Sequence, residues 1–142
     1  MNEMSKRAKT RIVPRKRIST GLFAGSLILC TDNSGARMLG LVQVMGYKGV
    51  KRRVPAAAVG DMIKVSVKDG IPDMRKKMFE AVIVRQRKPY RRKDGSWIQF
   101  EDNAAVIITP EGEPKGSNVK GPVAREATDR WPRLAGIAKI VV

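Results

Sequence analysis

Residues 81–107 read AVIVRQRKPYRRKDGSWIQFEDNAAVI and give the strongest indication of the fold. It begins with an apolar run at 81–84 and returns to a second apolar run at 104–108. Between the two runs lies Asp94-Gly95, a pair that tolerates the positive φ angles of a tight hairpin turn. The pattern therefore predicts a long β-hairpin whose base belongs to the core and whose two-residue turn lies at 94–95.

The middle of this hairpin is cationic, with six Lys/Arg and no acid in residues 85–93. Same-face neighbours on a strand lie about 7 Å apart, so each like-charge pair costs about 0.6 kcal/mol even in water. A bound phosphate backbone turns that repulsion into attraction. The alternative is a solvated charged face, but such faces usually mix both signs. We interpret the hairpin arm as a surface for a polyanion.

Composition supports this interpretation. The chain has 142 residues, a formal net charge of +16 and 42% hydrophobic residues, which fits one domain with a moderate core. A basic excess of this size favours nucleic acid as the partner. No run approaches the ~18 apolar residues of a membrane span. The basic start followed by residues 22–30 imitates a signal peptide, but its basic region is too long and no small-residue cleavage site follows.

The rest of the chain predicts a mainly β fold. Apolar runs at 27–30 and 36–45 and a period-2 alternation at 62–68 join the hairpin strands through Gly, Asp and Asn turns. Closing these strands removes exposed sheet edges, so we expect a small closed five-stranded antiparallel β-barrel. Residues 1–20 are expected to form a basic N-terminal arm and residues 21–142 a single barrel domain. That domain is expected to carry a β-ribbon at about 84–100 and a helical C-terminal part at about 121–138, starting after Gly121-Pro122.

Three groups of residues are candidates for contacts. A glycine-spaced basic loop at 46–53 and the ribbon are expected to bind RNA, since glycines admit close approach and cations suit phosphates. These candidates are Lys48, Lys51, Arg52, Arg53, Arg85, Arg87, Lys88, Tyr90, Arg91, Arg92, Lys93 and Trp97. The arm adds Lys6, Arg7, Lys9, Arg11, Arg15, Lys16 and Arg17. The less basic tail supplies expected protein contacts at Arg125, Trp131, Arg133 and Leu134, with core packing an equal alternative for Trp131 and Leu134.

The assumed two-residue turn also predicts which ribbon residues share a face. Arg92 would lie opposite Trp97 and Tyr90 opposite Gln99. One face would then present Tyr90, Arg92, Trp97 and Gln99 to an unpaired base. The other face, expected to turn toward protein, would hold Pro89, Arg91, Ile98 and Phe100.

The sequence lacks most catalytic chemistry. It has no histidine and one cysteine, which excludes a Cys/His zinc site and a Ser-His-Asp or Cys-His nucleophile within the chain. No phosphate-binding Walker loop or dinucleotide-binding glycine pattern is present. A nuclease with a carboxylate-only metal site is the remaining enzymatic alternative, but most of the candidate aspartates lie at turns, where backbone hydrogen bonding explains them. We therefore expect a binding or structural protein, not an enzyme, without cofactor or metal.

The stretch at 81–107 resembles the signature of the L-fourteen family of universal large-subunit ribosomal proteins. The matching features are the small residue and three aliphatics at 81–84, the basic spacer, Asp94-Gly95, Phe100, Asn103 and the aliphatic pair at 106–107. Residues 32–36, 59–61 and 121–123 match as well, so the resemblance covers about residues 20–142. The basic arm, residues 85–95 and Trp131-Pro132-Arg133 resemble the archaeal and eukaryotic branch.

The resemblance implies a five-stranded barrel with a projecting ribbon and a small helical C-terminal region. It also implies a structural role in the large ribosomal subunit in the cytoplasm, with large-subunit rRNA as the main partner. Further implied partners are small-subunit rRNA at inter-subunit bridges, neighbouring large-subunit proteins and the anti-association initiation factor six on the C-terminal part. The rival classes that charge alone permits are a free-standing basic RNA-binding protein and a DNA-architectural protein, which 2′-hydroxyl contacts would distinguish.

Overall fold

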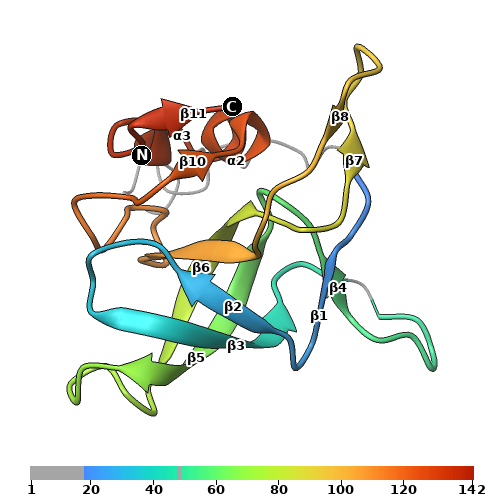
Figure 1. The fold of residues 1–142 in the computed structure, drawn as a ribbon. Helices are drawn as coiled ribbons and strands as arrows, with labels where there is room; N and C mark the ends of the chain where they lie inside the picture. Colours follow the sequence, from blue (N-terminus) through green and yellow to red (C-terminus); the bar gives the residue numbers. More distant parts are fainter. Residues whose placement is uncertain (1–17, 48) are drawn as a thin grey trace, which may run out of the picture.

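Five strands close into a barrel at the centre of the structure, a computed structural model that describes residues 18–47 and 49–142 (Figure 1). Neighbouring strands follow the order β2-β3-β5-β6-β9 around the barrel. Their bounds are Leu27–Cys30 for β2, Ala36–Val44 for β3, Met62–Gly70 for β5, Met78–Arg85 for β6 and Ala104–Ile108 for β9. The predicted mainly β fold with a closed five-stranded barrel is confirmed.

One pairing in the barrel differs from the antiparallel barrel that the sequence predicts. Strands β2 and β9 run parallel, with Leu29 opposite Ala104 and Cys30 opposite Ala105. The four other pairings are antiparallel. The reason is geometric, because in an up-and-down series with an odd number of strands the first and last strands point the same way. The strand pair that closes such a barrel must therefore be parallel.

The barrel interior is filled by aliphatic side chains. In β5 the inward residues Ile63, Val65 and Val67 are buried, while Lys64 and Ser66 between them are partly exposed. This confirms the period-2 alternation read from the sequence. Strand β9 is different, since all five of its residues are buried. The segment that follows it pairs with its end, through the bridge between Ile108 and Pro114 and the hydrogen bond from the Lys115 N–H to the Ile107 carbonyl over 3.0 Å.

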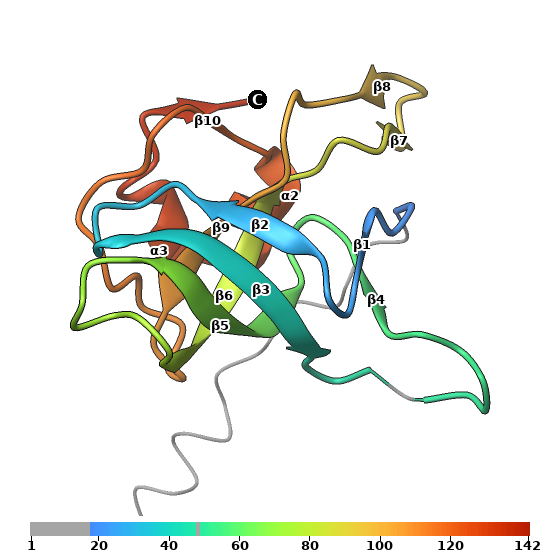
Figure 2. The same ribbon diagram turned by 60° about the horizontal axis from the view of Figure 1, so that its bottom comes forward.

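Three small units surround the barrel (Figures 1 and 2). Strand β1 (Leu22–Phe23) pairs with β4 (Ala56–Ala57), and β7 (Tyr90–Arg91) pairs with β8 (Trp97–Ile98) to form the projecting ribbon. In the C-terminal part, β10 (Pro122–Val123) pairs in parallel with β11 (Ile140–Val141). Two short helices lie between those last strands, α2 (Arg125–Arg130) and α3 (Pro132–Ala135). Helix α2 begins two residues after the helix start that the sequence suggests.

The helical part is anchored on the turn that precedes β5. Gly60 has a φ of +87°, and a Cβ there would lie 3.3 Å from the backbone oxygen of Glu126. This left-handed glycine lets α2 approach the turn closely. Trp131 Nε1 donates to the Gly60 carbonyl over 2.9 Å, and Arg130 pairs with Asp61 at 2.9 Å. None of the helices in the described ranges is long and apolar enough to cross a membrane.

Candidate nucleic-acid interface

The ribbon turns over three residues, 93–95, and not over two. The Arg92 N–H donates to the Ser96 carbonyl over 2.8 Å, and the Gly95 N–H donates to the Arg92 carbonyl over 3.0 Å. Gly95 has a φ of +92°, which is the left-handed residue of a three-residue hairpin loop. Asp94 Oδ1 completes the turn by accepting from the Ser96 N–H over 2.9 Å. The predicted two-residue turn at 94–95 is therefore wrong.

The longer turn shifts the pairing by one residue. Tyr90 lies opposite Ile98 and Arg91 opposite Trp97. A shift of one residue moves a whole strand's side chains to the other face. The predicted face that joined Tyr90 and Arg92 to Trp97 and Gln99 is thus wrong. Trp97, which is 66% exposed, shares its face with Arg91.

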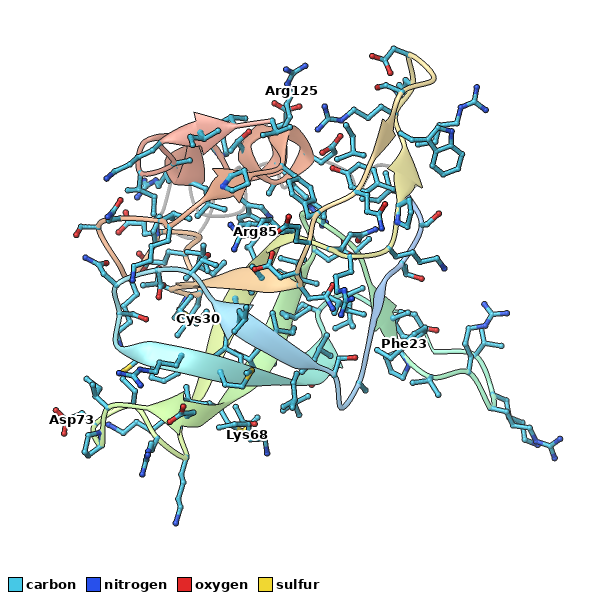
Figure 3. The ribbon with its side chains drawn as sticks, in the orientation of Figure 1. Phe23, Cys30, Lys68, Asp73, Arg85 and Arg125 are labelled. Atoms are coloured by element: carbon cyan, nitrogen blue, oxygen red, sulfur yellow. The ribbon has the colours of Figure 1, made fainter. Side chains whose placement is uncertain are left out.

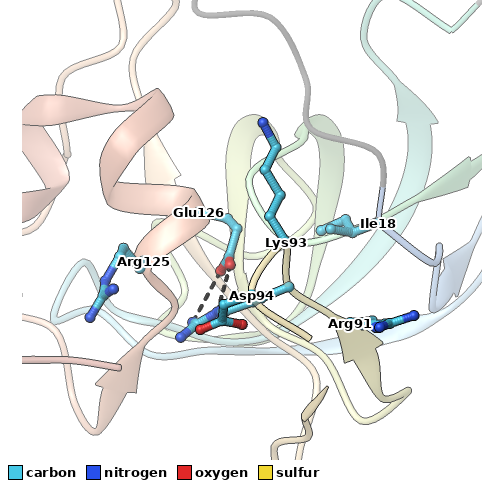
Figure 4. Close-up of a pocket in the computed structure, with 7 residues that line it drawn as sticks. Ile18, Arg91, Lys93, Asp94, Arg125 and Glu126 are labelled. Carbon is cyan, nitrogen blue, oxygen red and sulfur yellow. Dashed lines mark hydrogen bonds and ion pairs between the residues drawn. The ribbon is translucent and has the colours of Figure 1, made fainter. Parts of the chain in front are cut away.

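Tyr90 is completely buried and belongs to the core instead of to an RNA-stacking face. Its hydroxyl donates to Glu126 Oε2 over 2.8 Å, and Arg92 Nε donates to Glu126 Oε1 over 2.8 Å. Burial, together with the Glu126 carboxylate, raises the pKa of Tyr90 well above its usual value. Figure 4 shows Glu126 in a pocket between the ribbon and α2, with dashed lines that mark its interaction with Arg92. The prediction that Tyr90 stacks on a base is wrong, and Arg92 serves to hold the ribbon against α2.

Arg85 is also committed to the fold, with an exposed fraction of 7% (Figure 3). It pairs with Asp102 at 2.9 Å and donates to the carbonyls of Lys120 and Pro122 over 3.0 and 3.1 Å. These contacts use the guanidinium to join the ribbon base to the start of the C-terminal part. The expectation that Arg85 contacts RNA is therefore wrong for this side chain.

The remaining ribbon and loop candidates point to solvent. We name them the ribbon-side surface, and its members are Lys51, Arg52, Arg53, Arg87, Lys88, Arg91, Lys93 and Trp97. None of its cations forms an ion pair with another described residue. Both views show the ribbon and the loop between β3 and β4 projecting from the same side of the barrel (Figures 1 and 2). Lys48 and the arm candidates Lys6, Arg7, Lys9, Arg11, Arg15, Lys16 and Arg17 lie outside the described residues.

A buried glutamine joins the ribbon base to the segments beside β1 and β4. Gln86 is fully buried, and its Oε1 accepts from the Val59 N–H over 3.1 Å. Its Nε2 donates to the carbonyls of Ser19 and Lys88 over 2.9 and 3.0 Å. The same side chain thus connects the ribbon base, the segment after β4 and the segment before β1. The base of the ribbon is thereby fixed, and a fixed base reduces the entropy that the ribbon loses on binding.

The tail residues divide into two pairs. Leu134 is 1% exposed and lies in the core, which agrees with the core-packing alternative and not with an anchor for a partner. Trp131 packs partly buried against the core and lies 3.4 Å from a Cβ built at Gly112, which agrees with the packing alternative. Arg125 and Arg133 are exposed, and Arg133 pairs with Glu113.

Sequence reasoning missed Glu126 and Gln86, the two residues that position the ribbon. Glu126 lies in the first turn of α2, where its favourable interaction with the helix dipole already explains an acid. Gln86 lies within a cationic run and carries no pattern of its own. Among residues 18–47 and 49–142, no group of three or more His, Cys, Asp or Glu side chains could hold a metal ion.

The sequence matches one protein family over most of its length. Residues 21–142 match the family described as ribosomal protein L14p/L23e. The large ribosomal subunit protein uL14 of Thermoplasma volcanium is 58% identical over 122 residues, which is 86% of this chain and 92% of that protein. The protein of the same name from Pyrobaculum islandicum is 53% identical over 144 residues, covering 98% of this chain and 100% of its own length. The resemblance read from residues 81–107 is confirmed: this chain belongs to the ribosomal protein L14p/L23e family, as a structural ribosomal protein and not as an enzyme.

Proposed function

We propose that this chain is a structural constituent of the large ribosomal subunit and binds large-subunit rRNA through the ribbon-side surface. The observation that carries the proposal is the exposed face of the ribbon, where Arg91 and Lys93 accompany the 66% exposed Trp97. Cations without acidic partners attract phosphates, and an exposed aromatic ring stacks on an unpaired base. The names of the archaeal relatives support the large subunit as the location.

The loop before β4 is the second part of this binding surface. Lys51, Arg52 and Arg53 are exposed at its tip, on the same side of the barrel as the ribbon (Figure 1). Gln86 joins the ribbon base to Val59, which follows β4, so the ribbon and the loop before β4 project from connected parts of the fold. The arm candidates in residues 1–17 extend the same proposal to the N-terminus.

The finer parts of the proposal rest on the family. We propose that the protein acts in the cytoplasm, at the face of the large subunit that meets the small subunit, and contributes bridges to small-subunit rRNA. Its C-terminal part would contact neighbouring large-subunit proteins and the anti-association initiation factor six. Arg125 and Arg133 are the exposed residues of that part that these proteins would meet.

Two measurements test the proposal. In a density gradient of cell extract, the protein should migrate with large subunits at both low and high salt. The affinity of the purified protein for large-subunit rRNA should fall on the order of 10³-fold between 50 and 200 mM salt if six or more phosphates are contacted. Migration at the top of the gradient in low salt would indicate a free-standing RNA-binding protein. Equal affinity for DNA of the same length would indicate a DNA-architectural protein instead.

A further inference from the structure

The turn of the ribbon contains a chemically labile pair of residues. The chain has two Asp-Gly pairs, Asp94-Gly95 in the ribbon turn and Asp69-Gly70 at the end of β5. In an unstructured chain, aspartate before glycine rearranges to isoaspartate, because glycine has no side chain to hinder attack by its backbone nitrogen. Asp94 is exposed, and its turn lies at the outer end of the ribbon, away from the barrel (Figure 1). The ribbon keeps its shape only if this rearrangement is slow.

The rearrangement proceeds in two steps that release one water molecule and take one up. The Gly95 nitrogen attacks Cγ of the protonated Asp94 carboxyl, a C–N bond forms, and the carboxyl hydroxyl leaves with the amide hydrogen as water. Water then opens the resulting succinimide at either of its two carbonyls. Opening at the former backbone carbonyl leaves the chain running through Cβ and Cγ, with a free α-carboxylate. The product has the mass of aspartate but one more carbon atom in its backbone.

The folded turn holds both reacting groups in other contacts. The Gly95 N–H donates to the Arg92 carbonyl over 3.0 Å. Asp94 Oδ1 accepts from the Ser96 N–H over 2.9 Å and from the Ser96 hydroxyl over 2.6 Å. Aspartate commonly bonds the backbone two residues ahead in this way. Attack of the nitrogen on the carboxyl requires these contacts to open, so the turn must unfold locally before the pair rearranges.

Ser96 also keeps the carboxyl in its unreactive form. Its hydroxyl and N–H, aided by the positive charge of Arg92, hold the pKa of Asp94 below the usual value. The ionised carboxylate is a poor target for a nitrogen nucleophile, because its oxygen leaves as water only after protonation. The hydrogen bonds of Ser96 therefore oppose the reaction both by geometry and by charge.

We propose that Asp94-Gly95 is a site of isoaspartate formation and that Ser96 is the positioning residue that suppresses the reaction in the folded ribbon. Modification then occurs in chains whose ribbon turn opens. The extra backbone carbon lengthens a turn whose length sets the register, so a modified ribbon loses the pairing of Arg91 with Trp97. The chemistry at the turn is independent of the RNA-binding function proposed above.

Ser96→Ala tests the proposal in the full-length protein. Wild type and variant would be incubated at neutral pH, and isoaspartate would be measured by electron-transfer mass spectrometry, whose fragments distinguish the two isomers. Wild type in guanidinium chloride gives the rate at Asp94 in the unfolded chain. Native wild type should be on the order of 10-fold slower, because at least two hydrogen bonds must open first. Native Ser96→Ala should react about fivefold faster than native wild type, the value of one net hydrogen bond.

Two controls make each outcome decisive. Ser96→Thr keeps a hydroxyl and should behave like wild type. Asp69-Gly70 is held by pairing with β3 and by the contact of Asp69 with Arg75 at 3.5 Å, so Ser96→Ala should leave its rate unchanged. Equal rates at Asp94 in native Ser96→Ala and native wild type, or a rise at both Asp-Gly pairs, would overturn the role of Ser96. Absence of isoaspartate at Asp94 in the unfolded chain would overturn the site itself.

The consequence for RNA binding rests on the proposed function and is tested separately. The modified fraction, purified by chromatography, should bind large-subunit rRNA more weakly than the unmodified protein, because its ribbon no longer holds Trp97 beside Arg91. Equal affinity of the two fractions would contradict the part that the ribbon has in binding, and the modification site would stand. Weaker binding of the modified fraction would support both.

Discussion

Arg92 of the ribbon and Glu126 of α2 form an ion pair of 2.8 Å, although 34 residues separate them in the chain. Glu126 is buried and also accepts the hydrogen bond of Tyr90. Arg92 further donates to the Val142 carbonyl over 2.6 Å. One carboxylate thus fixes the inner face of the ribbon to the C-terminal part. The outward direction of Arg91 and Trp97 follows from this contact.

Removing the carboxylate charge should loosen the ribbon. Glu126→Gln leaves the Arg92 guanidinium poorly paired at a mostly buried position, and breaking such a pair costs roughly 3 kcal/mol of unfolding free energy. Urea unfolding of the purified protein measures the loss. Arg125→Gln, an exposed neighbour on the same helix, is the control and should change stability by less than about 0.5 kcal/mol. Equal stability of Glu126→Gln and wild type would contradict this account of the ribbon.

The observed register separates the roles of two adjacent ribbon residues. Trp97→Ala should weaken binding to large-subunit rRNA by about 1–3 kcal/mol, the value of one base stacked on an aromatic ring. Its effect on stability should be small because the ring is 66% exposed. Ile98→Ala should do the reverse, since Ile98 shares the inner face with Tyr90. RNA affinity and thermal unfolding of both variants decide the matter, and equal RNA losses would show that the stacking role is wrong.

Cys30 should react slowly with thiol reagents. Burial, followed by the nearby Asp32 carboxylate, raises its pKa from 9.0 to about 12. Because the thiolate is the reactive form, alkylation at pH 8 should be on the order of 10³-fold slower than for an unfolded chain. The folded state binds this proton more tightly, so its contribution to stability is complete below pH 9 and is lost between pH 9 and about 12. Reaction in urea gives the reference rate, and a native rate near it would contradict the raised pKa.

Trp131 should act mainly through stability. Trp131→Ala removes the packing near Gly112 and the hydrogen bond to the Gly60 carbonyl, which should cost about 2 kcal/mol for this partly buried ring. Trp131→Phe keeps most of the ring and should lose about 1 kcal/mol, the value of the hydrogen bond. Thermal unfolding compares the two variants. Affinity for isolated rRNA should be unchanged in both, and a loss as large as that of Trp97→Ala would contradict the assignment of Trp131 to the fold.

Local sequence signals are enough to predict the barrel strands, the existence of the ribbon and the basic character of its arm. These features depend on local signals: the alternation of Ile63, Val65 and Val67, the turn at Asp94-Gly95, and the run of cations in residues 85–93. Side-chain period and turn chemistry act over a few residues, so they are readable without the fold. The family resemblance came from the same local pattern at 81–107.

Which ribbon residues face solvent depends on long-range contacts that the sequence does not reveal. The sequence does not state whether the turn at Asp94-Gly95 has two or three residues, and that single residue moves Tyr90 from a solvent face into the core. It also does not show that Arg85 and Arg92, two of six cations in one run, meet the distant carboxylates of Asp102 and Glu126. Like charges in a row look the same in a sequence. The fold distinguishes them, because Arg85 and Arg92 each lie beside an acid, whereas the other four cations of the run form no ion pair with a described residue.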